Sequence, residues 1–160
     1  MSSSTVLPLL VDANSYIAFQ FGGFLTTLNG VKALKPPCLI VASQILPAMR
    51  TIISREMIEK GGLGPGEAAA RMGVTPAAVT QYLKGVRGSD SVNIVNKSRR
   101  AKKILLELAY ELAREETDMV IVLRKLCEAC NCIRSERLIC GMCQNSLPRL
   151  DSRKCDICAT

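Results

Sequence analysis

The sequence contains no histidine and no tryptophan, and its 160 residues include only three tyrosines and three phenylalanines. Without histidine, the chain cannot build the Ser-His-Asp or Cys-His arrangements of common hydrolases. It also cannot supply imidazole ligands, so any soft metal must be held by thiolates. Because aromatic side chains are scarce, aliphatic residues and methionine must fill the core. We expect a protein that is not an enzyme and that has no small-molecule substrate.

The sequence also lacks the uninterrupted apolar run of about 20 residues that a membrane span requires. The N-terminal stretch is apolar, but Asp12, Asn14 and Gln20 interrupt it, and the basic residues that begin a secretory signal are missing. We therefore expect a cytoplasmic protein without a membrane partner. Thiols stay reduced in that compartment, and clustered cysteines there bind metal more often than they form disulfides.

Apolar residues recur mostly at three- and four-residue steps, which predicts a mainly α fold. The first long helix is expected to follow the boundary at Pro36-Pro37, with Ser43 as its N-cap and Pro47 near its first turn. Cys38, just before that helix, is expected to be a small buried hydrophobic residue. The expected helices cover residues 44–60, 64–72, 75–84 and 98–116, with another from 117–118 onward, and residues 85–93 are expected to form a loop.

The stretch ARMGVTPAAVTQYLKGVRG, residues 70–88, contains two short helical segments separated by Gly73. Two short helices joined by a tight glycine turn are typical of the helix-turn-helix motif. Gly73 can adopt a positive φ at the turn, and Ala69 is small enough for the helices to cross closely. Val79 and Leu83 would face inward. The remaining side chains are mostly short or able to form hydrogen bonds, and they suit a DNA major groove: Thr75, Ala77, Thr80, Gln81 and Lys84.

Positive charge is concentrated around this motif. The formal net charge is +7, and residues 63–103 contain eight basic and two acidic residues, whereas residues 104–126 contain three basic and five acidic ones. A local basic excess indicates a polyanionic partner such as nucleic acid. Phosphate contacts, which set affinity and register, would come from Lys97, Arg99, Arg100, Lys102 and Lys103. Arg87 is a further candidate for binding DNA. The alternatives are a helix pair that serves only for packing and a charge that serves only for solubility.

Seven of the eight cysteines lie in the last part of the chain, and six of them form three Cys-x-x-Cys pairs within 32 residues. Two intervening residues let both sulfurs of a pair face one ion, so three pairs indicate a metal or a cluster. Four thiolates suit an iron–sulfur cluster or tetrahedral zinc equally. Cys132 breaks the spacing and is expected to be a bystander. The first choice of ligands is the outer pairs, followed by the central one: Cys127, Cys130, Cys155 and Cys158, then Cys140 and Cys143.

The segment LGPGEAAARMGVTPAAVTQYLKGVRG resembles the DNA-binding unit of the lambda-repressor-like (XRE-type) regulators. With the cysteine-rich tail, residues 36–160 are similar to a group of archaeal predicted transcriptional regulators. This resemblance implies a DNA-binding regulator and favours an iron–sulfur cluster over zinc. One part of the motif differs. Such motifs often begin with a Ser-Gln or Thr-Gln pair whose glutamine helps to hold a phosphate, and Gly64 and Pro65 stand there in this chain.

These observations predict four parts: an N-terminal extension of unknown role (1–35), a helix-turn-helix DNA-binding domain (36–96), connecting or dimerisation helices (97–126) and a cysteine-rich module (127–160). The module has few large apolar residues, so a bound metal would supply its folding energy. The expected function is a transcriptional regulator that binds double-stranded DNA as a homodimer, because such readers bind two half-sites about one helical turn apart. Its iron–sulfur cluster would sense redox state, oxygen or iron.

Two alternatives to this function remain open. One is a constitutive DNA-binding regulator with a structural zinc site. The other is a thiol redox protein that uses a Cys-x-x-Cys pair, although the βαβ pattern that normally presents such a pair is not predicted.

Overall fold

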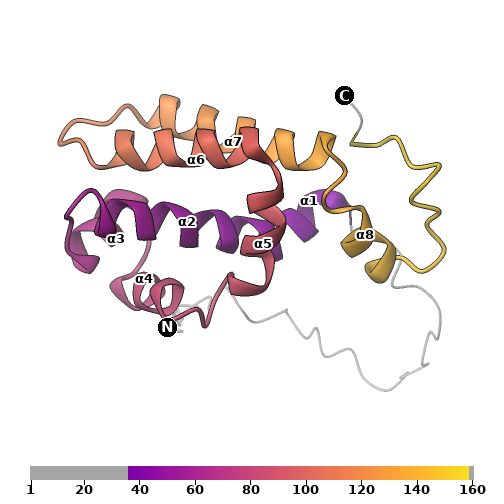
Figure 1. Cartoon of the computed structure of the whole chain (residues 1–160), viewed down its shortest axis with the longest axis horizontal. Helices are drawn as coiled ribbons and strands as arrows, with labels where there is room; N and C mark the ends of the chain where they lie inside the picture. Colours follow the sequence, from indigo (N-terminus) through magenta and orange to yellow (C-terminus); the bar gives the residue numbers. More distant parts are fainter. Residues whose placement is uncertain (1–35, 159–160) are drawn as a thin grey trace, which may run out of the picture. The chain divides into compact units, whose positions relative to one another are not determined.

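The structure is a computed structural model, and it describes residues 36–158. The predicted extension, residues 1–35, lies outside them. The described residues belong to one compact unit and are mainly helical without a strand, which confirms the predicted mainly α class. In chain order the elements are α1 (Pro37–Ile40), the π-helical turn η1 (Val41–Ile45), α2 (Leu46–Glu59), α3 (Pro65–Met72), α4 (Pro76–Leu83), α5 (Ser89–Lys97), α6 (Arg99–Leu112), α7 (Met119–Ser135) and α8 (Cys140–Ser146) (Figure 1).

The first three elements form one continuous helical segment, residues 37–59, which we call the central helix. It begins directly after Pro36, which is its N-cap, so the predicted boundary at the two prolines is confirmed. The prediction that the helix starts at Gln44 with Ser43 as its cap is wrong. Ser43 lies inside the helix, where its hydroxyl donates a hydrogen bond to the carbonyl of Leu39 at 2.8 Å. The sequence pattern missed this start because Pro47 suggested a first turn.

Pro47 lies well inside the central helix, where proline is normally disruptive. Its ring clashes with the carbonyl four residues earlier in a regular α-helix, and it has no N–H to donate. The helix widens to a π-helical turn just before it, and the N–H of Leu46 donates to the carbonyl of Val41, five residues back. This local change of hydrogen-bonding pattern lets the helix continue through the proline.

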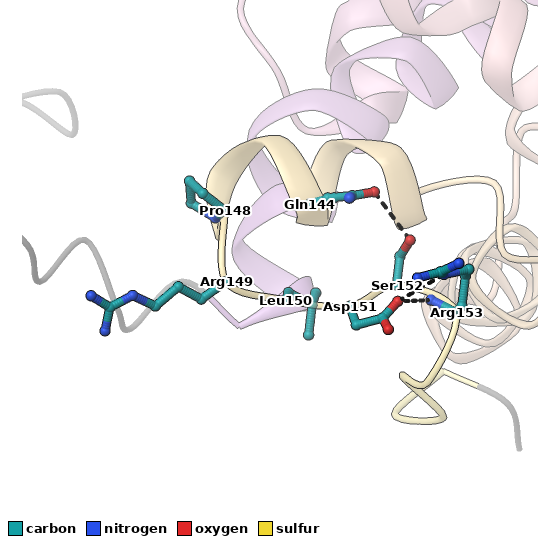
Figure 2. Close-up of a pocket in the computed structure, with 7 residues that line it drawn as sticks. All are labelled: Gln144, Pro148, Arg149, Leu150, Asp151, Ser152 and Arg153. Atoms are coloured by element: carbon teal, nitrogen blue, oxygen red, sulfur yellow. Dashed lines mark hydrogen bonds and ion pairs between the residues drawn. The ribbon is translucent and has the colours of Figure 1, made fainter.

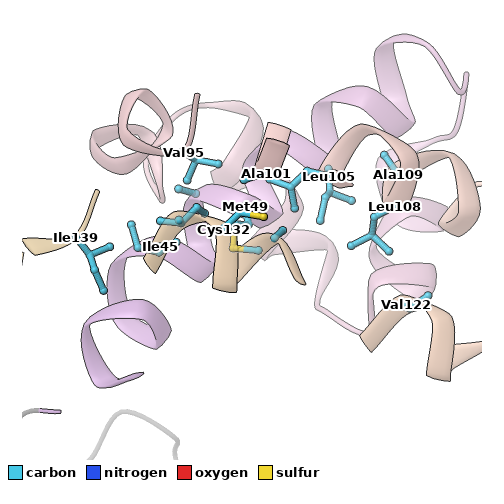
Figure 3. Close-up of a cluster of buried hydrophobic side chains, with 14 of the residues drawn as sticks. Ile45, Met49, Val95, Ala101, Leu105, Leu108, Ala109, Val122, Cys132 and Ile139 are labelled. Carbon is cyan, nitrogen blue, oxygen red and sulfur yellow. The ribbon is translucent and has the colours of Figure 1, made fainter. Parts of the chain in front are cut away.

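The core lies between the central helix and the helices around it. The helices α6 and α7 form an antiparallel hairpin along one side of α2, and α3, α4 and α5 also pack against α2 (Figure 1). Ile45 and Met49 of the central helix meet Val95 of α5 and Leu105 of α6 in this core (Figure 3). Each fully buried side chain of this size contributes about 1.5–3 kcal/mol to stability.

By length and composition the central helix could cross a membrane, and 44% of its apolar window is buried inside the protein. The core helix of a globular fold meets the same criteria. Ile45, Met49, Ile53 and Met57 are almost fully buried against the neighbouring helices. This burial makes the segment a core helix of the described unit.

Most of the predicted helix starts are confirmed, because their caps are local. Thr75 accepts a hydrogen bond from the N–H of Ala78 at 3.2 Å, and Asp118 accepts one from Val120 at 2.8 Å. The predicted loop at 85–93 is too long, since α5 already begins at Ser89. Its polar sequence is typical of a loop, but the burial of Val95 against α2 stabilises a helix there. The helix predicted over residues 98–116 is shorter in the structure, where α6 ends at Leu112.

Candidate nucleic-acid interface and thiol cluster

A tight turn at Gly73 joins α3 to α4. Gly73 has a φ of 62°, the left-handed conformation that the sequence predicts for it. Its N–H donates to the carbonyl of Ala70 at 3.2 Å, and the next N–H, that of Val74, donates to Ala69 at 3.0 Å. These bonds satisfy the last carbonyls of α3 and fix the direction of the chain as it leaves the helix. Ala69 and Val79 are fully buried where the two helices pack, as predicted.

The outward face of α4 contains the predicted base-reading residues. Four of them are exposed and Gln81 is partly exposed. The oxygen of Thr75 is used as an acceptor in the helix cap, and the hydroxyl of Thr80 donates to the carbonyl of Pro76 at 3.0 Å. Thr75 therefore keeps its O–H donor for a ligand, whereas Thr80 keeps its acceptor lone pairs. The exposed members are Thr75, Ala77, Thr80 and Lys84.

The loop after α4 is attached to the central helix. The hydroxyl of Thr51, which is fully buried, lies 3.1 Å from the carbonyl oxygen of Arg87 and 3.0 Å from that of Pro47, close enough to donate to either. Gly88 follows with a φ of 77°, and a Cβ atom there would lie only 2.6 Å from the carbonyl oxygen of Pro47. This close approach holds the exposed side chain of Arg87 next to α4. Sequence reasoning missed Thr51, because its partner is 36 positions away.

The basic start of α6 lies elsewhere on the surface. Arg99 and Arg100 are exposed in the first turn of α6, where Ser98 is the N-cap. Figure 1 shows α6 and α4 on different sides of α2. The two arginines therefore belong to a helix that lies on a different side of α2 from α4. Cations are electrostatically unfavourable at a helix N-terminus, and a bound anion would offset that cost.

Arg71 has a structural role that its place in the basic segment did not suggest. Its guanidinium pairs with Glu67 of the same helix at 2.6 Å. It also donates to the carbonyl oxygens of Leu112 and Ala113 at the end of α6. Cations stabilise a helix C-terminus. Arg71 thus attaches α3 to the α6–α7 hairpin, and its charge is already used within the protein.

The three Cys-x-x-Cys pairs lie in three different kinds of structure. The first is inside α7, the second is in the first turn of α8, and the third is in the irregular chain that follows α8. Burial raises the pKa of the Cys130 thiol, the Arg134 guanidinium lowers it, and the thiols of Cys127 and Cys158 raise it further. Cys130 on α7 therefore lies within electrostatic range of Cys158 at the end of the described chain.

The second pair meets the same thiol. Burial raises the pKa of the Cys143 thiol, and the neighbouring thiols of Cys158, Cys140 and Cys155 raise it further. The Cys158 thiol thus raises the pKa of one cysteine in each of the other two pairs. We call the six cysteines of these pairs the thiol cluster: Cys127, Cys130, Cys140, Cys143, Cys155 and Cys158.

Two arginines organise this cluster. Arg137 adopts a positive φ of 61°, and its guanidinium donates to the carbonyl of Cys155 at 3.1 Å and to that of Ser152. These bonds fold the last part of the chain back toward α7. A hydrogen bond to Cys158 raises the pKa of Arg134, and the nearby thiols of Cys130 and Cys38 raise it further. The Nε of Arg134 is buried, and no residue of the described chain accepts a hydrogen bond from it.

The thiols are neighbours but do not yet form a coordination sphere. Within residues 36–158, no three Cys, Asp or Glu side chains gather closely enough to hold a metal ion. Cys132 lies outside the cluster and is buried in the core near Met49 (Figure 3). The expectation that Cys38 is a buried hydrophobic residue is wrong, because its side chain is exposed. The short helix α1, which carries Cys38, packs against α8, and the Cys38 thiol also raises the pKa of Arg134 on α7.

A shallow hollow of about 420 Å³ lies beside the thiol cluster, in the loop after α8 (Figure 2). Ser152 donates to the side-chain oxygen of Gln144 at 3.1 Å, and Asp151 accepts two hydrogen bonds from Arg153 across the loop. The lining contains no cysteine, and its polar groups are largely paired with one another. These contacts order the loop that leads to the last Cys-x-x-Cys pair.

No protein-family model, curated protein or solved structure matches this chain. The arrangement of its own residues is therefore the basis on which its function is inferred.

Proposed function

We propose that this chain is a DNA-binding transcriptional regulator whose C-terminal thiols hold a metal centre that senses redox state, oxygen or iron. The observation that carries the proposal is the outward face of α4. This short helix is held by a glycine turn and presents small or hydrogen-bonding side chains beside an attached basic loop.

In this proposal α3 and α4 act as a helix-turn-helix unit, and α4 enters the major groove. The major groove is wide enough for one α-helix, and a glutamine side chain can make two hydrogen bonds to adenine there. Gln81 is the longest uncharged polar side chain on the outward face, so it would read a base, with Thr80 beside it. Lys84 would also read a base at the end of the helix, and Arg87 would contact a phosphate beside it.

Arg99 and Arg100 would contact a different stretch of backbone from that touched by α4. Because α6 lies across α2 from α4, we expect these two arginines to make the smaller contribution to affinity. Each phosphate contact that is lost should flatten the salt dependence by about one unit. The regulator would act as a homodimer, because readers of this type bind two half-sites.

The thiol cluster fits a metal centre in the chemistry of its donors. Four or more thiolates suit an iron–sulfur cluster, our first choice, or tetrahedral zinc. Such a centre carries net negative charge on its sulfurs, and the buried Nε of Arg134 is a donor without an acceptor among residues 36–158. Leaving a buried donor unpaired costs about 1–3 kcal/mol, and a thiolate-bound centre would remove that cost.

The residues that would hold the centre are those nearest Cys158. Cys130 and Cys143 share its neighbourhood, and Cys127, Cys140 and Cys155 flank them. An iron–sulfur centre would supply a change of charge or loss of the centre upon oxidation, whereas zinc would supply only cross-linking. The chain's own part is to connect α7, α8 and the final loop at one place.

The packing offers a path between the thiols and the DNA reader. Ser98, which caps α6, donates to Glu136 at the end of α7 at 2.9 Å, close in sequence to Arg134. The hairpin packs along α2, and α2 packs against α3 and α4. Movement at the thiol end of α7 would therefore reach α4 through helices that are in direct contact.

The alternatives differ in their observable properties. A constitutive regulator with a structural zinc site would be colourless and insensitive to oxidant. A Cys-x-x-Cys redox protein would cycle between dithiol and disulfide without any operator. We infer that the protein is cytoplasmic, since its cysteines are free thiols and the most apolar helix of residues 36–158 is a core helix.

Selection of binding sites from a random DNA library, using anaerobically purified full-length protein, tests the DNA-binding part. Gln81→Ala should weaken binding to the selected sequence by about 1–3 kcal/mol and binding to random DNA very little. Asn96→Ala on α5, also at an exposed position, is the matched control and should change neither. Failure to enrich any sequence, or equal losses on both DNAs, would refute sequence reading by α4.

Metal and sulfide analysis with a visible spectrum of the same sample tests the cluster. Cys158→Ser should remove the metal, because a hydroxyl is a far poorer ligand for a soft metal than a thiolate. Cys132→Ser should retain it. Broad visible absorption with iron and sulfide identifies an iron–sulfur centre, and a colourless zinc protein identifies the alternative. If oxidation then leaves operator affinity unchanged, the centre is structural.

A further inference from the structure

The start of α7 carries apolar side chains in every direction. Residues 119–123 read MVIVL, yet of these five only Val122 is buried. A helix that is apolar on all sides is normally enclosed by other protein. The others remain exposed by large fractions: Met119 55%, Val120 61%, Ile121 41% and Leu123 56%.

The exposed side of α7 forms a continuous stripe. Val120, Leu123 and Cys127 follow one another at steps of three and four residues, which places them on one face of the helix. An ion pair at 3.0 Å between Lys125 and Glu107 sets the register of the α6–α7 hairpin. It brings Tyr110 of α6, which is 72% exposed, level with the start of α7. An aromatic ring thus adds to the apolar surface at this end of the hairpin.

We propose that α7 packs antiparallel against α7 of a second copy of this chain, with Val120 and Leu123 at the centre of the contact. The inference deepens the proposed function, which calls for a dimer, by assigning the surface through which the dimer forms. A two-fold contact of this kind is self-complementary, so one stripe serves both partners.

The charges around the stripe favour this orientation. Glu115 and Glu116 precede α7, and Arg124 follows the apolar stretch. All three side chains are exposed, and none of them forms an ion pair within residues 36–158. Antiparallel packing brings Arg124 of one copy beside the glutamates of the other. Parallel packing would place like charges together, which is unfavourable.

A dimer at this surface would also connect the two proposed activities. The stripe begins at the free end of the hairpin and continues to Cys127, on the helix that carries the first thiol pair. Binding of a metal at Cys127 and Cys130 would hold the second half of α7. The angle between the two copies, and hence the spacing of their α4 helices, would then depend on the state of the thiols.

Sedimentation velocity of the full-length protein over a range of concentrations, without DNA, tests the inference. Wild-type protein should dimerise, and Leu123→Asp should weaken the dimer by about 30-fold or more, the effect of removing a central interface residue. Val86→Asp is the matched control, since Val86 is 71% exposed on the loop after α4, and it should leave the dimer unchanged. Circular dichroism checks that each variant remains folded.

Charge reversal gives an independent test of the orientation. Arg124→Glu alone should weaken the dimer several-fold, and the double variant with Glu116→Arg should restore it. A monomer at all concentrations would overturn the inference. A dimer that resists Leu123→Asp would also overturn it, by assigning the contact to another surface. Neither result depends on DNA binding, so failure of this inference and failure of the proposed function can be told apart.

Discussion

Replacing Gly88 by alanine should destabilise the protein because of both its backbone conformation and its close neighbours. Gly88 has a φ of 77°, and an L-residue in the left-handed region costs roughly 1–2 kcal/mol. The added Cβ would also lie 2.6 Å from the carbonyl oxygen of Pro47 and 2.7 Å from the hydroxyl oxygen of Thr51. Pushing the loop away from α2 adds about 1–3 kcal/mol, the usual cost of overpacking.

Gly85 provides the matched control three residues earlier. Its φ is 72°, but a Cβ there would meet only the Cβ of Ser89, at an ordinary 3.8 Å. Gly85→Ala should therefore cost about 1 kcal/mol, since alanine also lowers the entropy of the unfolded chain by about 0.4–1 kcal/mol. The difference between the two variants isolates the close approach of the loop to the central helix.

Urea unfolding of the full-length protein, followed by circular dichroism at 222 nm, measures both free energies of unfolding. Gly88→Ala should lose about 2–4 kcal/mol, and its excess over Gly85→Ala should be at least about 1 kcal/mol. Equal losses would show that the loop is not held against Pro47 as described. Gly88→Ala should also weaken the proposed DNA binding, because Arg87 moves with the loop.

Two further substitutions and one labelling experiment test other parts of the structure. Thr51→Val keeps the shape of the side chain but removes its hydrogen bonds to the loop and to α2, so it should lower the free energy of unfolding by about 1 kcal/mol in the same urea assay. Arg71→Met should separate α3 from the end of α6, and hydrogen exchange should rise there while remaining unchanged in α8. In metal-free protein, Cys130 and Cys143 should be alkylated more slowly at pH 8 in the folded than in the urea-unfolded chain, as measured by mass spectrometry, because their raised pKa values leave less thiolate.

The same raised pKa values determine how stability changes with pH. A thiol whose pKa is higher in the folded than in the unfolded state stabilises the metal-free fold below the unfolded pKa, and this contribution is lost as pH rises through the folded pKa. The metal-free protein should thus become less stable above about pH 8.5. Metal binding requires thiolates, so metal affinity should rise over the same range. A thermal-melting series with and without metal checks both signs.

Local features of the fold were the ones that the sequence predicted well. The turn at Gly73 and the caps at Thr75 and Asp118 depend on residues that are at most a few positions apart. The start of the central helix was mispredicted, because Pro47 follows its usual rule only in a regular α-helix. The helix α5 was partly missed, because its stability comes from packing against α2 and not from its own composition.

In the candidate site, too, the local features were predicted from the sequence and the long-range contacts were not. The outward residues of α4 followed from helical periodicity, and the Cys-x-x-Cys pairs were visible as spacing. The positions of Arg134 and Arg137 among the thiols required the path of the chain after α8, which no local pattern encodes. The attachment of Arg71 to the end of α6 likewise joins residues about 40 positions apart. These contacts depend on tertiary structure and were beyond sequence reasoning.

The central helix has a mechanical consequence. Its 23 residues span about 34 Å at 1.5 Å per residue, with α8 and Cys38 near one end and α3 and α4 near the other. A tilt of about 5° around its midpoint would displace each end by about 1.5 Å, whereas base-reading hydrogen bonds must be held within about 0.5 Å. The π-helical turn lies nearer the thiol end, so bending there would absorb a movement of that end before it reaches α4. Stiffness at Val41–Ile45 would thus set how much of a change at the thiols arrives at the DNA.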